Sequence, residues 1–242
     1  MRRFGGVQTA PGGAREPRRG RPGARVVLAL GLGLALTGVG SATPEPPPQS
    51  PAQRAWAVMG ATVVDPVSGV TVPEQSILVR AGRIEWIGAD RAADLPADTT
   101  VLDAEGRFVV PGLVDMHIHV TAQADALFVA NGVTTVRRMH GNEEALQWRE
   151  RNRGDVLGPR VFVAGPLLAG DATPWGHEIR VDLPSQAADV VGRVARDGYD
   201  FVKIYDDLDP GSYAAIAAAA RAQGIATVGH VPIDVGIAGA VE

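Results

Sequence analysis

Two patterns of hydrophobic and polar residues alternate along the chain after residue 109. Short apolar runs of strand length are followed by longer segments in which apolar residues return every three or four positions. The strands are predicted to start near Val109, Thr134, Arg160, Phe201 and Ile225, with helices over 122–131, 142–153, 184–196 and 210–223. Alternation of this kind predicts a parallel sheet whose strands are joined by crossover helices.

A glycine stands near the end of each of these predicted helices: Gly132, Gly154, Gly198 and Gly224. Glycine adopts the left-handed backbone conformation that commonly terminates a helix. We therefore expect all four glycines to act as helix caps.

The part of the chain before residue 109 shows the shorter alternation of a small β-sheet. Ala81-Gly82-Arg83 separates two apolar runs and predicts a tight hairpin connection. The strands are predicted at 57–64, 76–80, 84–88, 101–103 and 108–110. We expect this unit to have a structural role.

The first 55 residues have a different composition from the rest. An Arg-, Gly- and Pro-rich start is followed by an apolar run over 26–36 and by small residues up to Ala42. This order is typical of a secretory signal peptide, and the apolar run is shorter than the about 20 residues that a membrane span needs. We expect a signal peptide over 1–42, a Pro-rich linker over 43–55, and a periplasmic or secreted protein. An uncleaved N-terminal anchor is the alternative.

The charge and the residue composition exclude several kinds of partner and site. The formal net charge is −4, and because the first 42 residues hold seven arginines and one acid, the remainder is more acidic than this total. An acidic body argues against nucleic acid as a partner. The absence of cysteine excludes disulfides, thiolate metal sites and a cysteine nucleophile. Lys203 is the only lysine, which suggests that its position needs an amine and not a guanidinium.

The strand predicted near residue 109 leads into two histidines, His117 and His119. Side chains two positions apart on a strand point to the same face, so both imidazoles can bind one metal ion. The residues before them are apolar at both alternating positions, which predicts a buried strand. The alternative is a chance pair of histidines on a surface strand.

The stretch Pro111-Gly112-Leu113-Val114-Asp115-Met116-His117-Ile118-His119 resembles the first barrel strand of the amidohydrolase superfamily of metal-dependent hydrolases. Further segments resemble other parts of that family in the same order, namely 79–84, 87–88 and 103–106 in its N-terminal β-unit, and 131–137, 201–205 and 228–231 in its second, fourth and fifth strands. The resemblance covers 56–242. It implies an α/β fold, a TIM-type (β/α)8 barrel truncated after about five strands (109–242) and preceded by a small β-sandwich unit (56–108).

The resemblance also implies a metal centre. His117 and His119 would bind the more buried ion, and His230 would bind a second ion. Lys203 would react with carbon dioxide to give a carbamate that bridges two ions, which requires a neutral amine and hence a lowered pKa. The cofactor would be one or two divalent ions, with zinc favoured. The alternatives are a surface charge at Lys203 and a core histidine at position 230.

This sequence departs from the family pattern in several places. Five barrel strands fit into 109–242, and the family's sixth-strand histidine and eighth-strand catalytic aspartate have no counterpart, so the catalytic residue is expected beyond the end of this chain. Relatives often carry an acid at the position of Arg138. We therefore expect a fragment of a larger enzyme, with little or no hydrolase activity on its own.

Other polar residues fall at predicted loops after the strands. His140, His177 and Tyr205 are candidate substrate-binding residues, because loops that follow barrel strands carry function. His140 could equally be simply exposed. Asp206, Asp207 and Asp209 are expected to be solvated helix-capping acids, and Asp115 is either structural or a support for the histidines.

The resemblance implies hydrolysis of a carbon–nitrogen bond, in an amide, a cyclic amide or a dipeptide, by a metal-activated water. The lysine-bearing strand resembles the branch that contains Xaa-Pro dipeptidases and imidazolonepropionase-like proteins. A phosphotriester or lactone hydrolase and a catalytically inactive fragment are the alternatives. The expected partner is a small-molecule or dipeptide substrate, with no membrane contact after signal cleavage, and a second copy of the chain could cover the open edge as a homo-oligomer.

Overall fold

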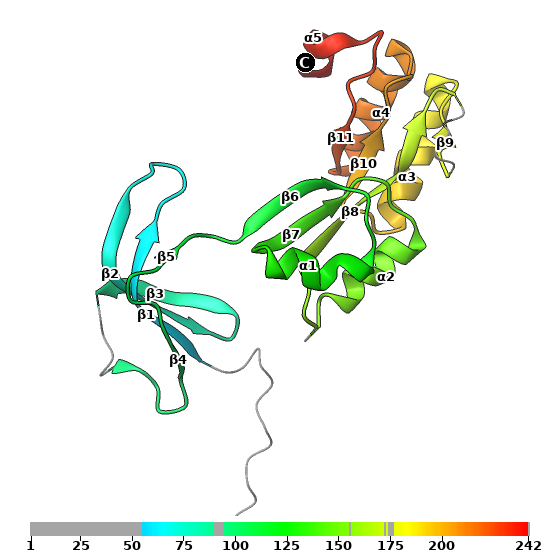
Figure 1. Cartoon of the computed structure of the whole chain (residues 1–242). Coiled ribbons are helices and arrows are strands. Elements are labelled where there is room, and N and C mark those ends of the chain that lie inside the picture. The colour runs from blue at the N-terminus through cyan, green and yellow to red at the C-terminus, as the bar shows by residue number, and fades with distance from the viewer. Residues whose placement is uncertain (1–54, 90–93, 155, 172, 174–176, 242) are drawn as a thin grey trace, which may run out of the picture. The chain divides into compact units, whose positions relative to one another are not determined.

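A computed structural model describes residues 55–89, 94–154, 156–171, 173 and 177–241 (Figure 1). The predicted signal peptide and nearly all of the predicted linker lie outside the described residues. Within the described part of the chain, no helix has the length and apolar character that crossing a membrane requires.

The N-terminal unit is one five-stranded sheet. Its strands are β1 (Trp56–Val64), β2 (Thr71–Arg80), β3 (Arg83–Ala89), β4 (Thr100–Asp103) and β5 (Phe108–Val109). β1 and β2, and β2 and β3, pair antiparallel, whereas β4 and β5 both pair parallel with β1. The predicted hairpin is confirmed, because Ala81 and Gly82 both have positive φ, as type I′ turns require.

The second sheet is entirely parallel along its main path. Its strands, in spatial order, are β11 (Ala226–Gly229), β10 (Phe201–Ile204), β8 (Arg160–Ala169), β7 (Val133–Arg138) and β6 (Leu113–Ile118), with the short β9 (Ile179–Arg180) paired to β8. This arrangement confirms the predicted α/β class, with a curled parallel sheet of half-barrel type that follows a separate small sheet in the sequence.

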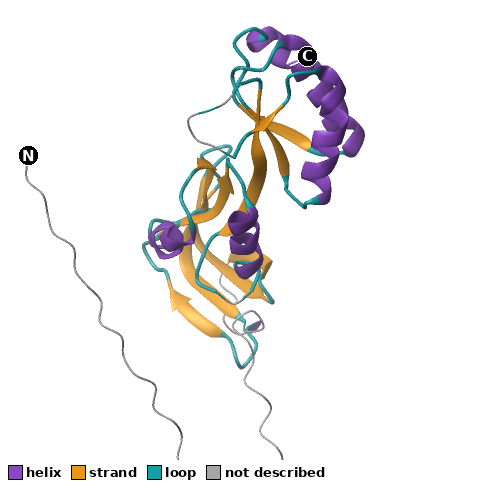
Figure 2. Ribbon diagram, turned by 90° about the vertical axis from the view of Figure 1, so that its right-hand side faces the viewer, coloured by secondary structure: helices purple, strands orange, loops and turns teal. Residues whose placement is uncertain are grey.

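Helices connect the successive parallel strands and pack on one face of this sheet (Figure 2). They are α1 (Asp125–Ala130), preceded by a 3-10 turn at Ala122–Ala124, α2 (Glu143–Arg151), α3 (Ala187–Arg196), preceded by a 3-10 turn at Pro184–Gln186, and α4 (Pro210–Gln223). A further short helix, α5 (Gly236–Val241), follows β11. Because helices cover one face, the side chains that alternate to the other face are left to form a site.

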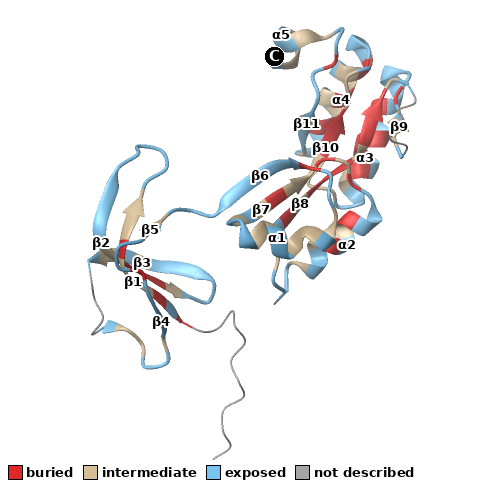
Figure 3. Ribbon diagram, viewed as in Figure 1, coloured by how far each residue is buried: buried red, intermediate tan, exposed pale blue. Residues whose placement is uncertain are grey.

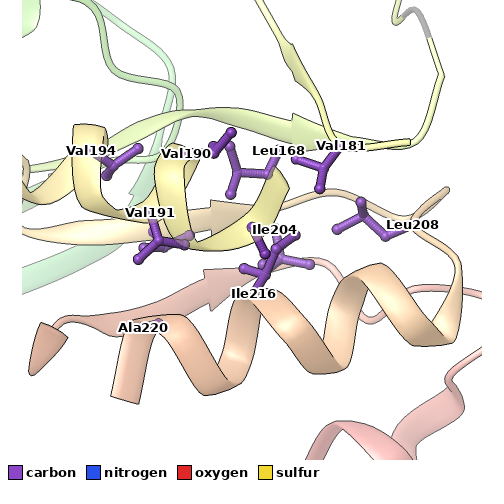
Figure 4. Close-up of a cluster of buried hydrophobic side chains, with 11 residues drawn as sticks. Leu168, Val181, Val190, Val191, Val194, Ile204, Leu208, Ile216 and Ala220 are labelled. Atoms are coloured by element: carbon purple, nitrogen blue, oxygen red, sulfur yellow. The ribbon is translucent and has the colours of Figure 1, made fainter. Parts of the chain in front are cut away.

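The largest apolar cluster lies between β8, β10, α3 and α4 (Figure 4). Leu168, Val191, Ile204 and Ile216 are almost completely buried in it. A second cluster joins β6, β7 and β8 to α2 through Ile118, Val136, Val163 and Trp148. Both clusters hold the strands in place from the helical side.

Helix α4 begins and ends at the residues that the sequence predicts. The Asp209 side chain accepts hydrogen bonds from the backbone N–H groups of Gly211 (2.8 Å) and Ser212 (3.0 Å), and Pro210 occupies the first turn. Gly224 ends the helix in the left-handed conformation, as Gly132 and Gly198 also have positive φ. The expectation for Gly154 is wrong: α2 ends at Arg151, and Gly154 lies in the turn that follows without a positive φ.

The strand that carries the histidine pair is not the buried strand that its apolar composition predicts. Residues 113–117 of β6 are exposed, and only Ile118 is buried (Figure 3). Within the described residues, β6 pairs only with β7 and is therefore an edge strand, so its apolar side chains lack a neighbour on one side.

One buried polar contact ties α1 to α2, and its loss has a predictable cost. Asp125 accepts hydrogen bonds from the indole N–H of Trp148 (2.8 Å) and from the amide of Asn152 (3.2 Å), and Trp148 is 2% exposed. Asp125→Ala leaves the buried indole donor unpaired, so we expect the free energy of unfolding to fall by about 1–3 kcal/mol in urea denaturation. Asp189→Ala, at an exposed first-turn acid of α3, should change it by less than about 1 kcal/mol. Equal losses in the two variants would contradict this role.

Candidate metal centre

The histidine pair converges at the end of β6. His117 is on the strand, His119 follows it directly, and their Nε2 atoms are 3.1 Å apart. Two nitrogens that bind one tetrahedral zinc ion at 2.0–2.1 Å are separated by about 3.3–3.4 Å, so the observed distance fits a shared ion. The carboxylate of Asp115 accepts a hydrogen bond from the backbone N–H of His117 (3.2 Å), which assigns Asp115 a structural contact next to the pair.

Both imidazoles favour the neutral form that binds a metal. Partial loss of hydration is the main cause that lowers the pKa of the largely exposed His117 and His119. Nearby positive charge adds to it: Lys203 acts on His117, and His117 together with Arg138 acts on His119. A neutral ring offers a lone pair at neutral pH.

Lys203 is buried on β10, which lies between β8 and β11 in the sheet. Its side chain is 1% exposed, and its Nζ has no hydrogen-bond partner among the described residues. Burial, reinforced by the charge of Arg137 and opposed by Asp206, lowers the pKa of the amine to about 8. At pH 7 this pKa makes the neutral amine roughly 300-fold more abundant than it is in an ordinary lysine.

His230 follows β11 and is held in place from two sides. Its backbone N–H donates to the carbonyl of Ile204 (3.1 Å), and its Nδ1 lies 3.5 Å from the Asp206 carboxylate. Its ring lies 4.8 Å, between centroids, from that of Tyr205. Gly229 makes this close approach feasible, because a Cβ there would lie 2.2 Å from the carbonyl oxygen of Ile204. A carboxylate at Nδ1 leaves Nε2 as the metal-facing nitrogen, as in many metal-binding histidines.

These side chains share one pocket of about 470 Å³. It is lined by His119, Arg138, His140, Leu167, Lys203, Tyr205 and His230. They come from β8 and β10 and from the ends of β6, β7, β10 and β11, which is the edge where barrel enzymes place their active sites.

The structure brings most of the candidate residues together. Five of the seven line this pocket, and His117 adjoins it through His119. His177 does not line it, but His140 forms a hydrogen bond to the backbone of His177, which itself has positive φ. Burial is the main cause that lowers the pKa of His140.

The residues present fit a metal ion in part. In the described part of the chain, no three His, Cys, Asp or Glu side chains lie close enough together to hold an ion on their own. The Nε2 atoms of His117 and His119 are nevertheless close enough to share one ion, and the amine of Lys203 has no hydrogen-bond partner among the described residues. Nitrogen donors of these kinds suit zinc.

Two expectations for acidic residues near the site are wrong. Of the three aspartates expected to cap a helix, only Asp209 does so. Asp206 lies against His230, and the Asp207 carboxylate accepts backbone hydrogen bonds from Gly170 (3.0 Å) and Asp171 (2.9 Å). Both aspartates lie in the loop after β10, several residues before α4 starts at Pro210. Their side chains therefore contact neighbouring loops and do not cap that helix.

Arg138 is the pocket residue that sequence reasoning did not place. It ends β7, lines the pocket, and has a buried Nη1 without a hydrogen-bond partner among the described residues. Burial lowers the pKa of its guanidinium, against the opposing charge of Glu144. The available sequence signal was the arginine itself, because relatives often carry an acid at this position. Such a change of charge indicates a different pocket wall.

Curated proteins resemble short segments of this chain. The matches include an adenine deaminase from Rubrobacter xylanophilus, 41% identical over 59 residues (24% of this chain, 10% of the relative), and a dihydroorotase from Pelotomaculum thermopropionicum, 44% identical over 63 residues (26% and 14%). An imidazolonepropionase from Deinococcus radiodurans is 41% identical over 86 residues (36% and 18%). No family model matches the chain.

Solved structures match a larger part. A protein from Bifidobacterium longum described as a prolidase superposes with a TM-score of 0.67 at 26% identity, over 76% of this chain and 51% of its own. A Xaa-Pro dipeptidase gives a TM-score of 0.59 at 21% identity, over 73% and 56%, and supports the fold alone. The chain thus spans less than a fifth of each curated relative described here and about half of each solved structure. Over the part that it shares with these proteins, the chain resembles enzymes of the amidohydrolase superfamily in sequence and in fold.

Proposed function

We propose that the protein is a metal-dependent hydrolase that cleaves the carbon–nitrogen bond of small amides, cyclic amides or dipeptides. One observation carries the proposal: two histidines with Nε2 atoms 3.1 Å apart adjoin the pocket that holds a buried lysine amine without a hydrogen-bond partner among the described residues. The names of its relatives, dihydroorotase, imidazolonepropionase and prolidase, support the same bond type. The start of the sequence supports export to the periplasm or the exterior.

His117 and His119 would hold the first ion, and Lys203 and His230 would complete the set. A divalent ion such as zinc supplies an activated water and polarises the substrate carbonyl. Lys203 becomes an oxygen ligand when its neutral amine bonds to the carbon of carbon dioxide and releases one proton. Burial favours this step, because it lowers the pKa of the amine to about 8 and so raises the fraction of the neutral form that can react.

The remaining pocket residues would bind and orient the substrate. His140 and Tyr205 line the pocket and present ring nitrogens and a phenol to a ligand. Asp206 fixes the ring of His230 from its Nδ1 side. The apolar side chain of Leu167 keeps one wall of the pocket free of competing polar groups.

A hydrolysis assay tests the proposal. The protein from its complete gene, loaded with zinc, is incubated with glycyl-proline and with a cyclic amide, and amine release is followed with and without metal. We expect zinc-dependent turnover that falls on the order of 10- to 100-fold in Tyr205→Phe or His140→Ala. Zinc-loaded protein that cleaves neither substrate, or cleavage that is indifferent to metal, would overturn the proposal. Arg153→Ala, at an exposed residue after α2, should leave the rate unchanged.

A further inference from the structure

The face of the parallel sheet opposite the helices carries a row of two arginines and two phenylalanines. Val136, Val161 and Val202 pack in the apolar clusters on the helical side, so the residues next to them on each strand face the other way. The row consists of Arg137 on β7, Arg160 and Phe162 on β8, and Phe201 on β10. Lys203 also follows Val202 directly and therefore shares this face.

The side chains of this row stack on one another from end to end. The guanidinium of Arg160 lies 4.9 Å from the centroid of the Phe162 ring, and the rings of Phe162 and Phe201 are 6.3 Å apart. The guanidinium of Arg137 lies 5.2 Å from the centroid of the Phe201 ring. A cation over an aromatic face is attracted to it, so the stacking fixes where both guanidinium groups lie.

Arg137 contacts the strands that carry the candidate metal ligands. Its Nε donates to the carbonyl of Met116 (2.8 Å), the residue before His117. Its guanidinium lies over Phe201, which precedes Lys203 by two positions, or about 6.6 Å along the strand. One side chain thus brings a permanent positive charge close to the lysine amine, and after burial this charge is the next cause that lowers the pKa of Lys203.

A permanent cation beside a cation site calls for an anion between them. A guanidinium stays protonated in proteins and repels a divalent ion. None of the described residues that line the pocket is acidic, and the carboxylate of Asp206 is placed against His230. The amine of Lys203, which has no hydrogen-bond partner among the described residues, becomes an anion when it reacts with carbon dioxide.

We propose that Arg137 favours the carbamate of Lys203, so that this anion forms on the metal-free protein and precedes metal binding. The inference rests on the proposed function, in which the carbamate is a metal ligand. In this step the neutral amine nitrogen bonds to the carbon of carbon dioxide, and one N–H proton passes to solvent. Because the side chain gains negative charge, a fixed positive charge nearby stabilises the product over the reactant. Arg137 does not line the pocket and acts through Lys203, so it is a positioning residue.

Carbon NMR of the metal-free chain tests this inference without turnover. The chain is made with lysine that is isotopically labelled at Nζ, stripped of metal with a chelator, and equilibrated with labelled carbon dioxide. Coupling between the labelled nitrogen and the labelled carbon identifies a lysine carbamate, and Lys203 is the only lysine in the sequence. We expect a carbamate signal in the metal-free wild type and none in Lys203→Met.

Substitutions of Arg137 separate its charge from its packing. Arg137→Gln keeps a donor for the Met116 carbonyl and removes the charge. We expect its apparent affinity for carbon dioxide to fall about threefold to sixfold, as for one or two units of charge about 8 Å apart and screened as in water. Arg137→Lys keeps the charge and should stay within about twofold of the wild type. The double variant Arg137→Lys, Lys203→Met shows any carbamate on the introduced lysine.

Arg160→Gln is the matched control, because it removes the arginine at the other end of the same row. It should also stay within about twofold of the wild type. Circular dichroism establishes that each variant is folded. A metal-free wild type without the carbamate would overturn the inference, and so would equal affinities in Arg137→Gln and the wild type. Equal losses in Arg137→Gln and Arg137→Lys would also overturn it, because packing alone would then explain both.

Failure of this inference can be told apart from failure of the proposed function. Zinc-dependent hydrolysis by a protein that forms no carbamate without metal would refute the inference and leave the proposed function standing. A carbamate that depends on Arg137, in a protein that hydrolyses no amide, would contradict the proposed function alone.

Discussion

Alanine substitution of His117 and His119 together is expected to lower the zinc affinity of the protein by about 100-fold or more. Loss of a residue that merely supports a metal ligand costs 10- to 100-fold in affinity, and here two direct ligands are removed. The 3.1 Å separation of the two Nε2 atoms would let both rings bind the same ion, so neither ring alone would replace the pair. Competition with a zinc-binding dye measures the affinity, and elemental analysis measures the bound metal.

His140→Ala is the matched control for this experiment. It removes the same kind of side chain from the same pocket but from a different strand end, and we expect a change in zinc affinity of less than about tenfold. Circular dichroism establishes that both proteins are folded. Retention of tight zinc binding in the double variant, or an equal loss in His140→Ala, would show that the ion is held elsewhere.

Local sequence signals predicted the helices and most of the parallel strands well, but the first parallel strand, predicted to start near Val109, starts at Leu113. Helix α4 has an aspartate cap, a proline in its first turn and a left-handed glycine at its end, so three independent local rules agree on its bounds. The starts of β8 at Arg160 and β10 at Phe201 are also as predicted. In these segments the backbone conformation is set by neighbours in the sequence.

The pairing of strands was less accessible from the sequence. β4 and β5 both pair with β1, although each is separated from it by more than 35 residues, and the hydrophobic pattern does not specify such pairings. The exposure of β6 was missed for a related reason. An apolar strand is buried only where other chain segments cover it, and composition does not reveal whether such neighbours exist.

The candidate site, too, could be predicted from the sequence only in part. The spacing of His117 and His119 fixes their common face, and a single lysine in an arginine-rich chain pointed to Lys203, whose side chain proves to be 1% exposed. The position of Arg138 in the pocket wall could not be predicted from the sequence. It depends on the end of β7 lying beside the pocket and on a buried Nη1, and both are properties of packing.

The stability of the metal-free protein is expected to rise by about 3 kcal/mol between pH 7 and pH 10.5 because of Lys203 alone. Its pKa is about 8 in the folded chain and 10.5 in the unfolded chain. Below pH 8 the amine is protonated in both states, and the folded state bears the full cost of burying the charge. Between pH 8 and pH 10.5 the unfolded chain binds more protons than the folded chain, so the free energy of unfolding increases.

The sequence makes this pH window diagnostic. Lys203 is the only lysine, and the other groups that ordinarily titrate between pH 7.5 and pH 10.5 are the α-amino group and three tyrosines. Burial raises the pKa of Tyr199, which lowers stability above about pH 10, so urea denaturation is measured from pH 7 to pH 9.5, where about 2 kcal/mol of the rise is expected. Metal and carbon dioxide are excluded, since either would change the state of the amine.

Lys203→Met should abolish the rise and give a protein that is more stable than the wild type by about 3 kcal/mol at pH 7, because a buried charge is replaced by an apolar chain of similar length. The same substitution removes the amine that a carbamate requires, so greater stability and loss of a metal ligand should appear in one variant. A wild type whose stability is flat from pH 7 to pH 9.5 would mean that the amine is hydrated or paired in solution, and the case for Lys203 as a reactive neutral amine would then fail.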